Sequence, residues 1–206
     1  MYEYVCMSKY VCIIAGDTSG DVYAGDLIAQ LATNRSDIKF QGIAGDSAQS
    51  QGMQLWVHNK HLNFMGFTEV LLRHKLIIST WRTITQNIEK NKPDLLILID
   101  YPGLNMRVAK WAKQRGIPIF YYIPPQVWAW GRARIEKLRQ YTDYIAPLYP
   151  FEQDFLIKAK LNTTLVKHPL LNKILAQQLN HPCTEKPIEI VCMPGSREQE
   201  VRKHLE

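Results

Sequence analysis

The stretch DLLILID, residues 94–100, decides how the rest of the chain is interpreted. Five apolar residues follow one another without interruption, and Asp100 comes directly after them. A continuous apolar run of this kind is typical of a strand that is buried on both faces, as in parallel sheets covered by helices on either side. The stretch therefore predicts a central strand of an α/β protein.

The segments on either side of this strand repeat one pattern, in which a short β-rich run is followed by a helical one. Strands are predicted over 11–15, 39–45, 56–58, 117–123, 144–149, 164–167 and 188–195, and helices over 21–32, 67–88, 103–115 and 131–140. Repeated βα units imply a parallel sheet with helices on both faces, which is a Rossmann-like α/β fold.

A polar, proline-punctuated stretch towards the C-terminus predicts a domain boundary. We expect a Rossmann-like N-terminal domain over 1–167, followed by an interdomain helix and linker over 168–187. A fresh strand and turn come next, so residues 188–206 are predicted to begin a second α/β domain that is truncated.

Composition and charge exclude several classes of protein. The 206 residues are 46% hydrophobic and 21% charged, which is ordinary for a globular protein. The net charge of +6 favours anionic partners such as phosphate, nucleic acid or a membrane surface, without choosing among them. No run approaches the roughly 18 apolar residues of a membrane span, and no signal peptide is expected. The four cysteines have no metal-binding spacing, so no metal site is predicted.

In an open α/β sheet, ligands bind outside the carboxyl ends of the strands. Three stretches are predicted to lie there, namely GDTSGD (16–21), IDYPGLN (99–105) and YYIPPQVWAW (121–130). Asp100, in the second stretch, would be partly desolvated, which raises the pKa of its carboxyl group and suits a general base. The alternative is a turn or cap aspartate before Pro102 and Gly103.

The turn GDTSGD comes directly before a predicted helix. Gly16 and Gly20 permit a tight turn, and the free backbone N–H groups with the helix dipole can receive an anion or hydroxyl groups. Helix capping by Thr18 or Ser19 is the alternative, and the same residues can do both. The turn is neither a GxGxxG motif nor a P-loop, which argues against a dinucleotide or nucleoside triphosphate site.

A second turn of this kind, PGSR (194–197), follows the last predicted strand. Arg197 presents a fixed fork of donors beside Ser196, which suits a phosphate or diphosphate. A capping box from Ser196 to Gln199 is the alternative, and both interpretations can hold.

The long helix that begins at Phe67 has two predicted faces. Its core face is expected to carry Phe67, Val70, Leu71, Ile77, Ile78 and Trp81 and to continue to Ile88. Leu72 and Leu76 would then lie on the opposite face among basic residues, where they can contact a lipid surface. Scattered surface leucines, or leucines packed under a loop, are the alternative.

Several motifs together resemble those of one known family. They are AGDTSGD, GIAGD, FMGFTEVL, IDYPGLN, YYIPPQVWAW, LYPFE, HPL and PGSR, in the family's order from about residue 11 onwards. The set resembles lipid-A-disaccharide synthase, a family of inverting glycosyltransferases, and QVWAW with IDYPG upstream is its most specific part. The resemblance implies an N-terminal domain of a GT-B fold, in which two Rossmann-like domains face each other across a cleft.

The resemblance also implies a reaction, in which UDP-2,3-diacylglucosamine and 2,3-diacylglucosamine 1-phosphate give the β-1′,6-linked lipid A disaccharide and UDP. Asp100 would be the general base for the acceptor 6-hydroxyl, and no metal ion or other cofactor is expected. Ser196 and Arg197 would bind the donor diphosphate. The acceptor site would include Asp17, Ser19, Gly20, Gln126, Trp128 and Trp130, with the tryptophans forming an apolar wall on a proline-stiffened loop.

Because both substrates are membrane lipids, the resemblance implies a peripheral position at the inner face of the cytoplasmic membrane and no nucleic-acid partner. Little or no activity is expected of these 206 residues alone, since most of the donor domain would be missing. Two alternatives stay open: a non-catalytic protein that keeps an acylated-sugar pocket, and another GT-B relative such as a UDP-N-acetylglucosamine epimerase. The sequence indicates neither an oligomeric state nor a preferred acyl-chain length.

Overall fold

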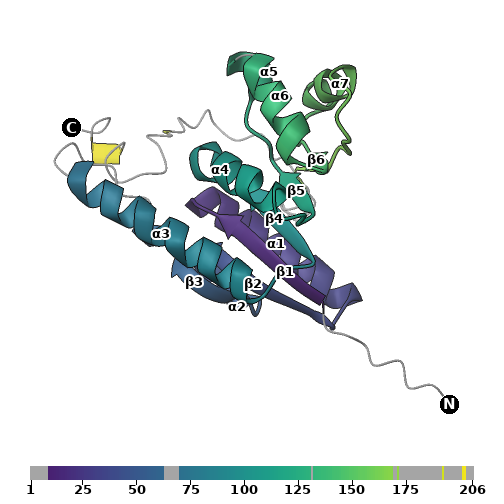
Figure 1. The fold of residues 1–206 in the computed structure, drawn as a ribbon. Coiled ribbons are helices and arrows are strands. Elements are labelled where there is room, and N and C mark those ends of the chain that lie inside the picture. The colour runs from purple at the N-terminus through teal and green to yellow at the C-terminus, as the bar shows by residue number, and fades with distance from the viewer. Residues whose placement is uncertain are drawn as a thin grey trace. The chain divides into compact units, whose positions relative to one another are not determined.

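The computed structural model describes residues 9–62, 70–130 and 132–168, together with residues 171, 192 and 201–202. The chain divides into two compact units, Met1–Pro169 and Leu170–Glu206. The helices and strands whose bounds the structure gives all lie in the first unit (Figure 1). The linker and the second domain predicted from the sequence fall almost entirely outside the described residues, so that division stays a prediction.

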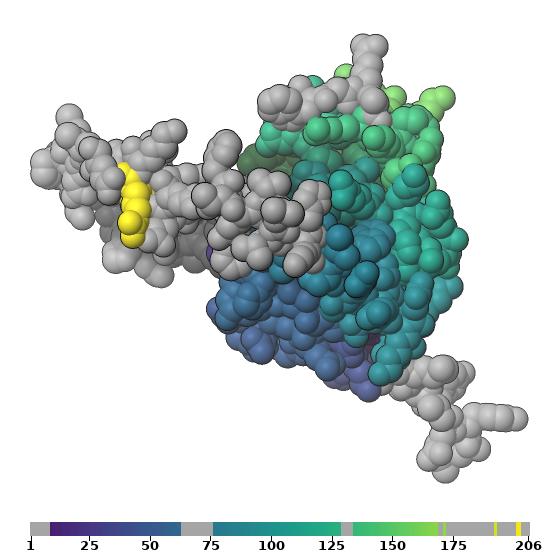
Figure 2. Space-filling view, turned by 60° about the vertical axis from the view of Figure 1, so that its left-hand side comes forward, coloured from purple at the N-terminus to yellow at the C-terminus, as the bar shows by residue number. Residues whose placement is uncertain are grey.

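Six strands of the described residues form one parallel sheet in the order β3-β2-β1-β4-β5-β6. They are β1 (Lys9–Ala15), β2 (Ile38–Ala44), β3 (Gln54–His58), β4 (Leu95–Ile99), β5 (Ile119–Tyr122) and β6 (Tyr144–Ala146). The chain builds outwards from β1 to β3, then returns to the other side of β1 and builds outwards again. In the space-filling view, the blue residues of the first half and the green residues of the last helices accordingly lie at opposite ends (Figure 2). The predicted Rossmann-like sheet is confirmed, and its direction of growth reverses between β1 and β4.

Helices cover both faces of this sheet. One face packs against α1 (Thr18–Asn34) and α2 (Asp46–Ser50), and the other against α3 (Val70–Lys90), α4 (Pro102–Lys113), α6 (Arg132–Tyr141) and α7 (Pro150–Lys158). The two remaining elements are short, the 3-10 helix η1 (Asn59–His61) and the helix α5 (Val127–Trp130). The last of these corrects the sequence analysis, which expected a loop over QVWAW.

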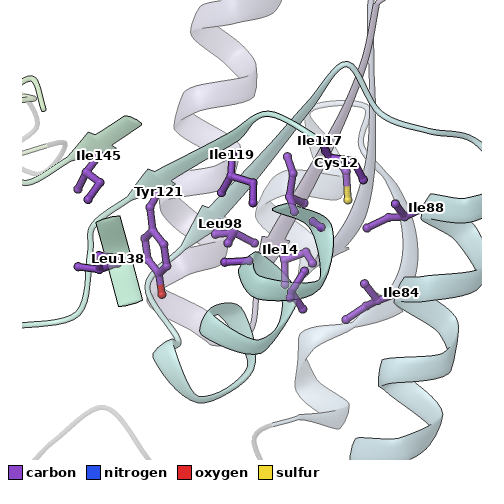
Figure 3. Packing of buried hydrophobic residues seen from close by; sticks show 14 of the residues in the cluster. Cys12, Ile14, Ile84, Ile88, Leu98, Ile117, Ile119, Tyr121, Leu138 and Ile145 are labelled. Atoms are coloured by element: carbon purple, nitrogen blue, oxygen red, sulfur yellow. The ribbon is translucent and has the colours of Figure 1, made fainter. Parts of the chain in front are cut away.

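The core consists of two layers because successive strand residues point to opposite faces. In β4, Leu96 and Leu98 belong to the layer under α3 and α4, whereas Ile97 and Ile99 belong to the layer under α1. Figure 3 shows the first layer, with side chains of the central strands meeting those of α3. Full burial of each such aliphatic side chain contributes about 1.5–3 kcal/mol. An uninterrupted apolar run is therefore what this strand requires.

The predicted core face of α3 is wrong at Ile77 and Ile78. Ile77 and Ile78 are 47% and 48% exposed, whereas Thr80, Ile84 and Ile88 are buried. The buried residues Thr80, Ile84 and Ile88 recur at every fourth position, and that series leaves Ile77 and Ile78 to one side. Of the residues expected to face outwards, Leu76 is half-buried. The side chains of 70–75, Leu72 among them, lie outside the description, as do residues 63–69.

A strand predicted over 164–167 is also absent from the described residues, which have only an isolated bridge between Ile145 and Thr163. The Ile145 N–H donates to Asn162, and the Thr164 N–H donates back to Ile145 at 3.1 Å, as in a parallel ladder. Pro147 comes next on the β6 side and has no N–H to donate back to Thr164, although its carbonyl oxygen accepts the Val166 N–H at 3.1 Å. The pairing therefore ends after one bridge.

Candidate active site

The backbone at the carboxyl end of β4 is strained. Asp100 and Tyr101 have φ values of 44° and 45°, and Ile123, after β5, has 58°. These are three of the four non-glycine residues with positive φ in the described part of the chain. A left-handed conformation is uncommon for such residues and is a genuine outlier for a β-branched one. Strain of this kind is retained where surrounding contacts enforce it, and such places are often functional sites.

Two side chains hold the strained residue Asp100 in place. The Asn105 side-chain amide, fully buried, donates to the carbonyl oxygens of Asp100 at 2.7 Å, Ile99 at 3.0 Å and Ile14 at 3.3 Å. The Tyr121 hydroxyl donates to the same Asp100 carbonyl at 2.9 Å. Asn105 thereby joins the ends of β1 and β4, the two strands between which the sheet changes direction. The sequence analysis did not single out this residue, although it quoted the IDYPGLN stretch that contains it.

The turns after β1 and β4 touch at Gly16. A Cβ atom at this position would lie 2.3 Å from the Tyr101 ring, far inside van der Waals contact. Glycine is therefore required here for the close approach of two turns, in addition to any freedom that it gives the backbone. This contact brings the GDTSGD turn and Asp100 to the same edge of the sheet, as predicted.

The carboxyl group of Asp100 has a raised pKa. Burial is the main cause, because the charged form loses water, and the negative charge of Asp17 adds to it. A hydrogen bond with the backbone of Tyr101 acts in the opposite direction. Burial likewise raises the pKa of Tyr23, with added effects from Tyr149, Asp100 and Asp17. Asp17 therefore lies close enough to affect Asp100, and a raised pKa of the Asp100 carboxyl group suits a general base.

Asp17, in the GDTSGD turn, caps α1 in place of the predicted Thr18 or Ser19. Its Oδ1 accepts the Gly20 N–H at 2.7 Å, whereas Thr18 and Ser19 are exposed within the first turn of α1. The side-chain amide of Asn59 donates to the Asp17 carbonyl at 2.8 Å. Capping by Thr18 or Ser19 is thus incorrect. The capping function of Asp17 leaves its second carboxylate oxygen with no hydrogen bond to the described residues.

A pocket of about 280 Å³ opens beside Asp100. It is lined by Asp100, Pro102, Ile123, Pro124, Pro125, Gln126, Arg134, Leu148, Tyr149 and Glu152. These residues come from the ends of β4, β5 and β6 and from the helices that follow them. The pocket combines an apolar wall of prolines and aliphatic side chains with a few polar groups, which is usual for a small-molecule site.

Not every predicted site residue reaches this pocket. Gln126 lines it together with Asp100, and Trp128 donates its indole N–H to Glu152 Oε1 at 3.1 Å, so it lies one residue behind the lining. The Trp130 side chain, Ser196 and Arg197 fall outside the described residues. Three observations bring Asp100, the aromatic stretch and the first turn together. Gln126 lines the same pocket as Asp100, Trp128 contacts the lining residue Glu152, and Asp17 lies close enough to Asp100 to raise its pKa.

The sequence analysis missed three polar or aromatic lining residues, which are Arg134, Tyr149 and Glu152. Two of them stand in the LYPFE motif, and the third in the basic segment after the tryptophans. Glu152 is buried, and nothing in the sequence around it predicts that burial.

The described residues contain no group of three or more histidine, cysteine, aspartate or glutamate side chains arranged to hold a metal ion. No helix among those described is both long enough and apolar enough to span a membrane.

The model of the family described as lipid-A-disaccharide synthetase matches residues 11–206. The chain belongs to this family. A curated lipid-A-disaccharide synthase of Syntrophus aciditrophicus is 35% identical over 204 residues, which are 96% of this chain and 53% of that protein. Lipid-A-disaccharide synthase 1 of Legionella pneumophila is 38% identical over 204 residues, with 95% and 53% covered. This member of the synthetase family thus spans about half the length of the curated relatives it matches.

Solved structures with the same fold come from sugar-nucleotide enzymes. The UDP-GlcNAc 2-epimerase of Neisseria meningitidis has a TM-score of 0.57 and 11% identity, with 84% of this chain and 50% of that chain covered. The corresponding epimerase of Rickettsia bellii has a TM-score of 0.53 and 14% identity, with 84% and 48% covered. At such identities the likeness concerns the fold alone, and the fold is that of a GT-B N-terminal domain. Membership of the synthetase family, whose members are glycosyltransferases, favours the synthase interpretation over the epimerase alternative.

Proposed function

We propose that this chain forms the acceptor side of a glycosyltransferase that joins UDP-2,3-diacylglucosamine to 2,3-diacylglucosamine 1-phosphate. Asp100 takes the proton of the acceptor 6-hydroxyl as that oxygen attacks the anomeric carbon of the donor. The bond from this carbon to the diphosphate breaks on the opposite face, and UDP leaves. The products are the β-1′,6-linked disaccharide, UDP and a protonated Asp100 carboxyl group.

The observation that carries this proposal is the setting of Asp100. Its backbone is strained, its carboxyl group lies at a pocket, and burial with the Asp17 charge raises its pKa. A carboxylate that is poorly solvated holds a proton more readily, which is what a general base requires. We assign acceptor contacts to Asp17, Ser19, Gly20, Gln126, Trp128 and Trp130, and donor diphosphate contacts to Ser196 and Arg197.

The exchange Asp100→Asn tests the role of the base. Asparagine tolerates positive φ and cannot accept the proton, so we expect kcat to fall by about 10²–10⁴-fold. Turnover is measured by sugar transfer from radiolabelled donor, with the protein in its full natural length. The matched control is Asp94→Asn, since Asp94 lies before the amino end of the same strand, and it should retain near-normal rates. A rate within about twofold of the wild type for Asp100→Asn removes the residue as base.

For these 206 residues alone, we expect acceptor binding with little or no turnover, because they span about half the length of the relatives. Binding of 2,3-diacylglucosamine 1-phosphate in mixed micelles, followed by tryptophan fluorescence, tests the first part. A chain that binds neither this acceptor nor UDP-2,3-diacylglucosamine does not support the proposed function.

We also propose a peripheral position at the inner face of the cytoplasmic membrane, because both proposed substrates are lipids. Ile77 and Ile78 of α3 support a lipid contact, since both are about half exposed on a basic protein. Changing both to serine should lower binding to phosphatidylethanolamine–phosphatidylglycerol vesicles severalfold in a flotation assay. Ile157→Ser is the control, because Ile157 on α7 is equally exposed. Equal flotation of the two variants contradicts the contact.

A further inference from the structure

Three aromatic side chains form an exposed cluster next to the pocket. We call Trp128 of α5, Tyr149 and Phe151 the aromatic cluster. The Trp128 and Phe151 rings meet edge to face with centroids 5.3 Å apart, and the Tyr149 and Phe151 rings stack at 5.7 Å. Their exposed fractions are 46%, 46% and 52% for Trp128, Tyr149 and Phe151. Large apolar side chains that are exposed together mark binding surfaces more often than single ones do.

A hydrogen bond and ring packing fix the orientation of Trp128 in the aromatic cluster. Glu152 is buried, yet its carboxylate accepts the Trp128 indole N–H at 3.1 Å. A hydrogen bond to a buried charged acceptor is stronger than one between neutral groups, so it fixes the orientation of the indole. Phe151 precedes Glu152 in the first turn of α7, and its ring packs against the indole. Rigid aromatic side chains lose little conformational entropy when a ligand covers them.

The aromatic cluster is continuous with the pocket that contains Asp100. Tyr149 belongs to both, because it lines the pocket and stacks on Phe151. Glu152 also lines the pocket while it holds Trp128. A ligand whose polar part lies beside Asp100 and Gln126 therefore meets these rings where it leaves the pocket.

We propose that the aromatic cluster binds an acyl chain of the sugar whose polar ring occupies the Asp100 pocket. This inference rests on the proposed function, which supplies an acylated sugar as the ligand. Three rings offer a short apolar surface that matches a hydrocarbon chain. A stable protein partner would bury roughly 800 Å² on each side, far more than three half-exposed side chains provide. Phe151 and Tyr149 are thus specificity-determining residues for the acyl group.

Calorimetry with two soluble probes tests the proposal on the 206-residue chain. The probes are N-acetylglucosamine 1-phosphate and N-octanoylglucosamine 1-phosphate, which both carry an amide and differ only in the length of the acyl chain. We expect the octanoyl compound to bind about tenfold more tightly or better, because partial burial of several methylene groups is favourable. Phe151→Ser should remove most of this preference and leave the affinity for N-acetylglucosamine 1-phosphate within about twofold. Phe151→Leu, which keeps an apolar side chain, should restore much of it.

Ile157→Ser is the matched control, since Ile157 lies on the same helix with 54% exposure and is neither a lining residue of the pocket nor part of the aromatic cluster. Its preference for the octanoyl compound should equal that of the wild type. Equal binding of the two probes by the wild type overturns this inference and leaves the sugar pocket intact. If neither probe binds, the proposed function fails with it. If Phe151→Ser changes only the oligomeric state or vesicle binding, the cluster covers a protein or a membrane, and the inference is wrong.

Discussion

Asp21 and Asp100 are two aspartates at the same edge of the sheet, and their surroundings differ sharply. Asp21, in the first turn of α1, is buried, and its carboxylate accepts the N–H groups of Gly45 at 2.7 Å, Ser47 at 3.0 Å and Ala48 at 3.0 Å. Asp100 is half-buried at a pocket, and the hydrogen bond that favours its charge is one to the backbone of Tyr101.

The difference separates a structural carboxylate from one that is available for chemistry. Three backbone donors satisfy Asp21 and make it the cap of α2, although it belongs to another helix. Burial destabilises the charged form of Asp100, and no comparable set of hydrogen bonds offsets this effect. Its raised pKa is therefore the expected result. One edge of a sheet therefore holds both kinds of carboxylate, one satisfied by backbone hydrogen bonds on the β1–β2 side and one that lines a pocket on the β4–β5 side.

The largest effect on stability is expected for Asp21→Ala. The exchange leaves buried N–H groups at the start of α2 without a partner, which should lower the free energy of unfolding by about 3 kcal/mol. Asp21→Asn retains one acceptor oxygen and should lose about half as much. Urea unfolding followed by circular dichroism measures both. A loss below about 1 kcal/mol for Asp21→Ala would show that water replaces the carboxylate, and the contrast with Asp100 would weaken.

A smaller effect is expected for Gly16→Ala, which tests whether the turns after β1 and β4 pack as one unit. The added methyl group meets the Tyr101 ring at 2.3 Å, so overpacking should cost about 1–3 kcal/mol. Gly103→Ala is the matched control, because a Cβ there has no neighbour within 4 Å and the residue is helical. That control should be neutral or stabilising by about 0.5 kcal/mol. Equal thermal midpoints for the two variants would contradict the tight contact.

The smallest effect concerns Asp100→Asn, now as a change in stability. Because the folded-state pKa of Asp100 lies above the unfolded value of about 3.9, folding favours its neutral form. Wild-type stability is therefore full below the unfolded pKa and falls as the pH rises through the folded pKa. Asparagine has no such loss, so Asp100→Asn should raise Tm by about 1–3 °C at pH 7 and by less at pH 3.5. A variant that is less stable at pH 7 would mean that the carboxylate is well satisfied after all.

Much of the fold follows from local pattern. The run 94–100 predicted β4 as a strand buried on both faces, and the alternation of strands and helices predicted the parallel sheet. A run of consecutive aliphatic residues predicts a buried strand even when the helices and strands that pack against it are not known. The same holds for Asp100, whose position after the run placed it at the edge where ligands bind.

The rest depends on contacts that are distant in sequence. Asp21 accepts hydrogen bonds from residues 24 to 27 positions away, and Trp128 donates one to Glu152, 24 positions away. No local sequence pattern predicts hydrogen bonds over such separations. The predicted face of α3 is wrong at Ile77 and Ile78 because the buried series there includes the polar residue Thr80, which a pattern of apolar residues does not reveal. The assigned roles of the acceptor and donor residues stay predictions.

Tyr101 presses its ring against Gly16, and Asn105 ties the ends of two strands together, so one wall of the pocket is fixed by packing and hydrogen bonds. Beside the pocket, the rings of the aromatic cluster are about half exposed. None of these three rings belongs to the two core layers of the described residues. On the proposed acyl contact, single substitutions at positions 149 and 151 are expected to change which acyl chain is accepted while Asp100 and its supports stay in place.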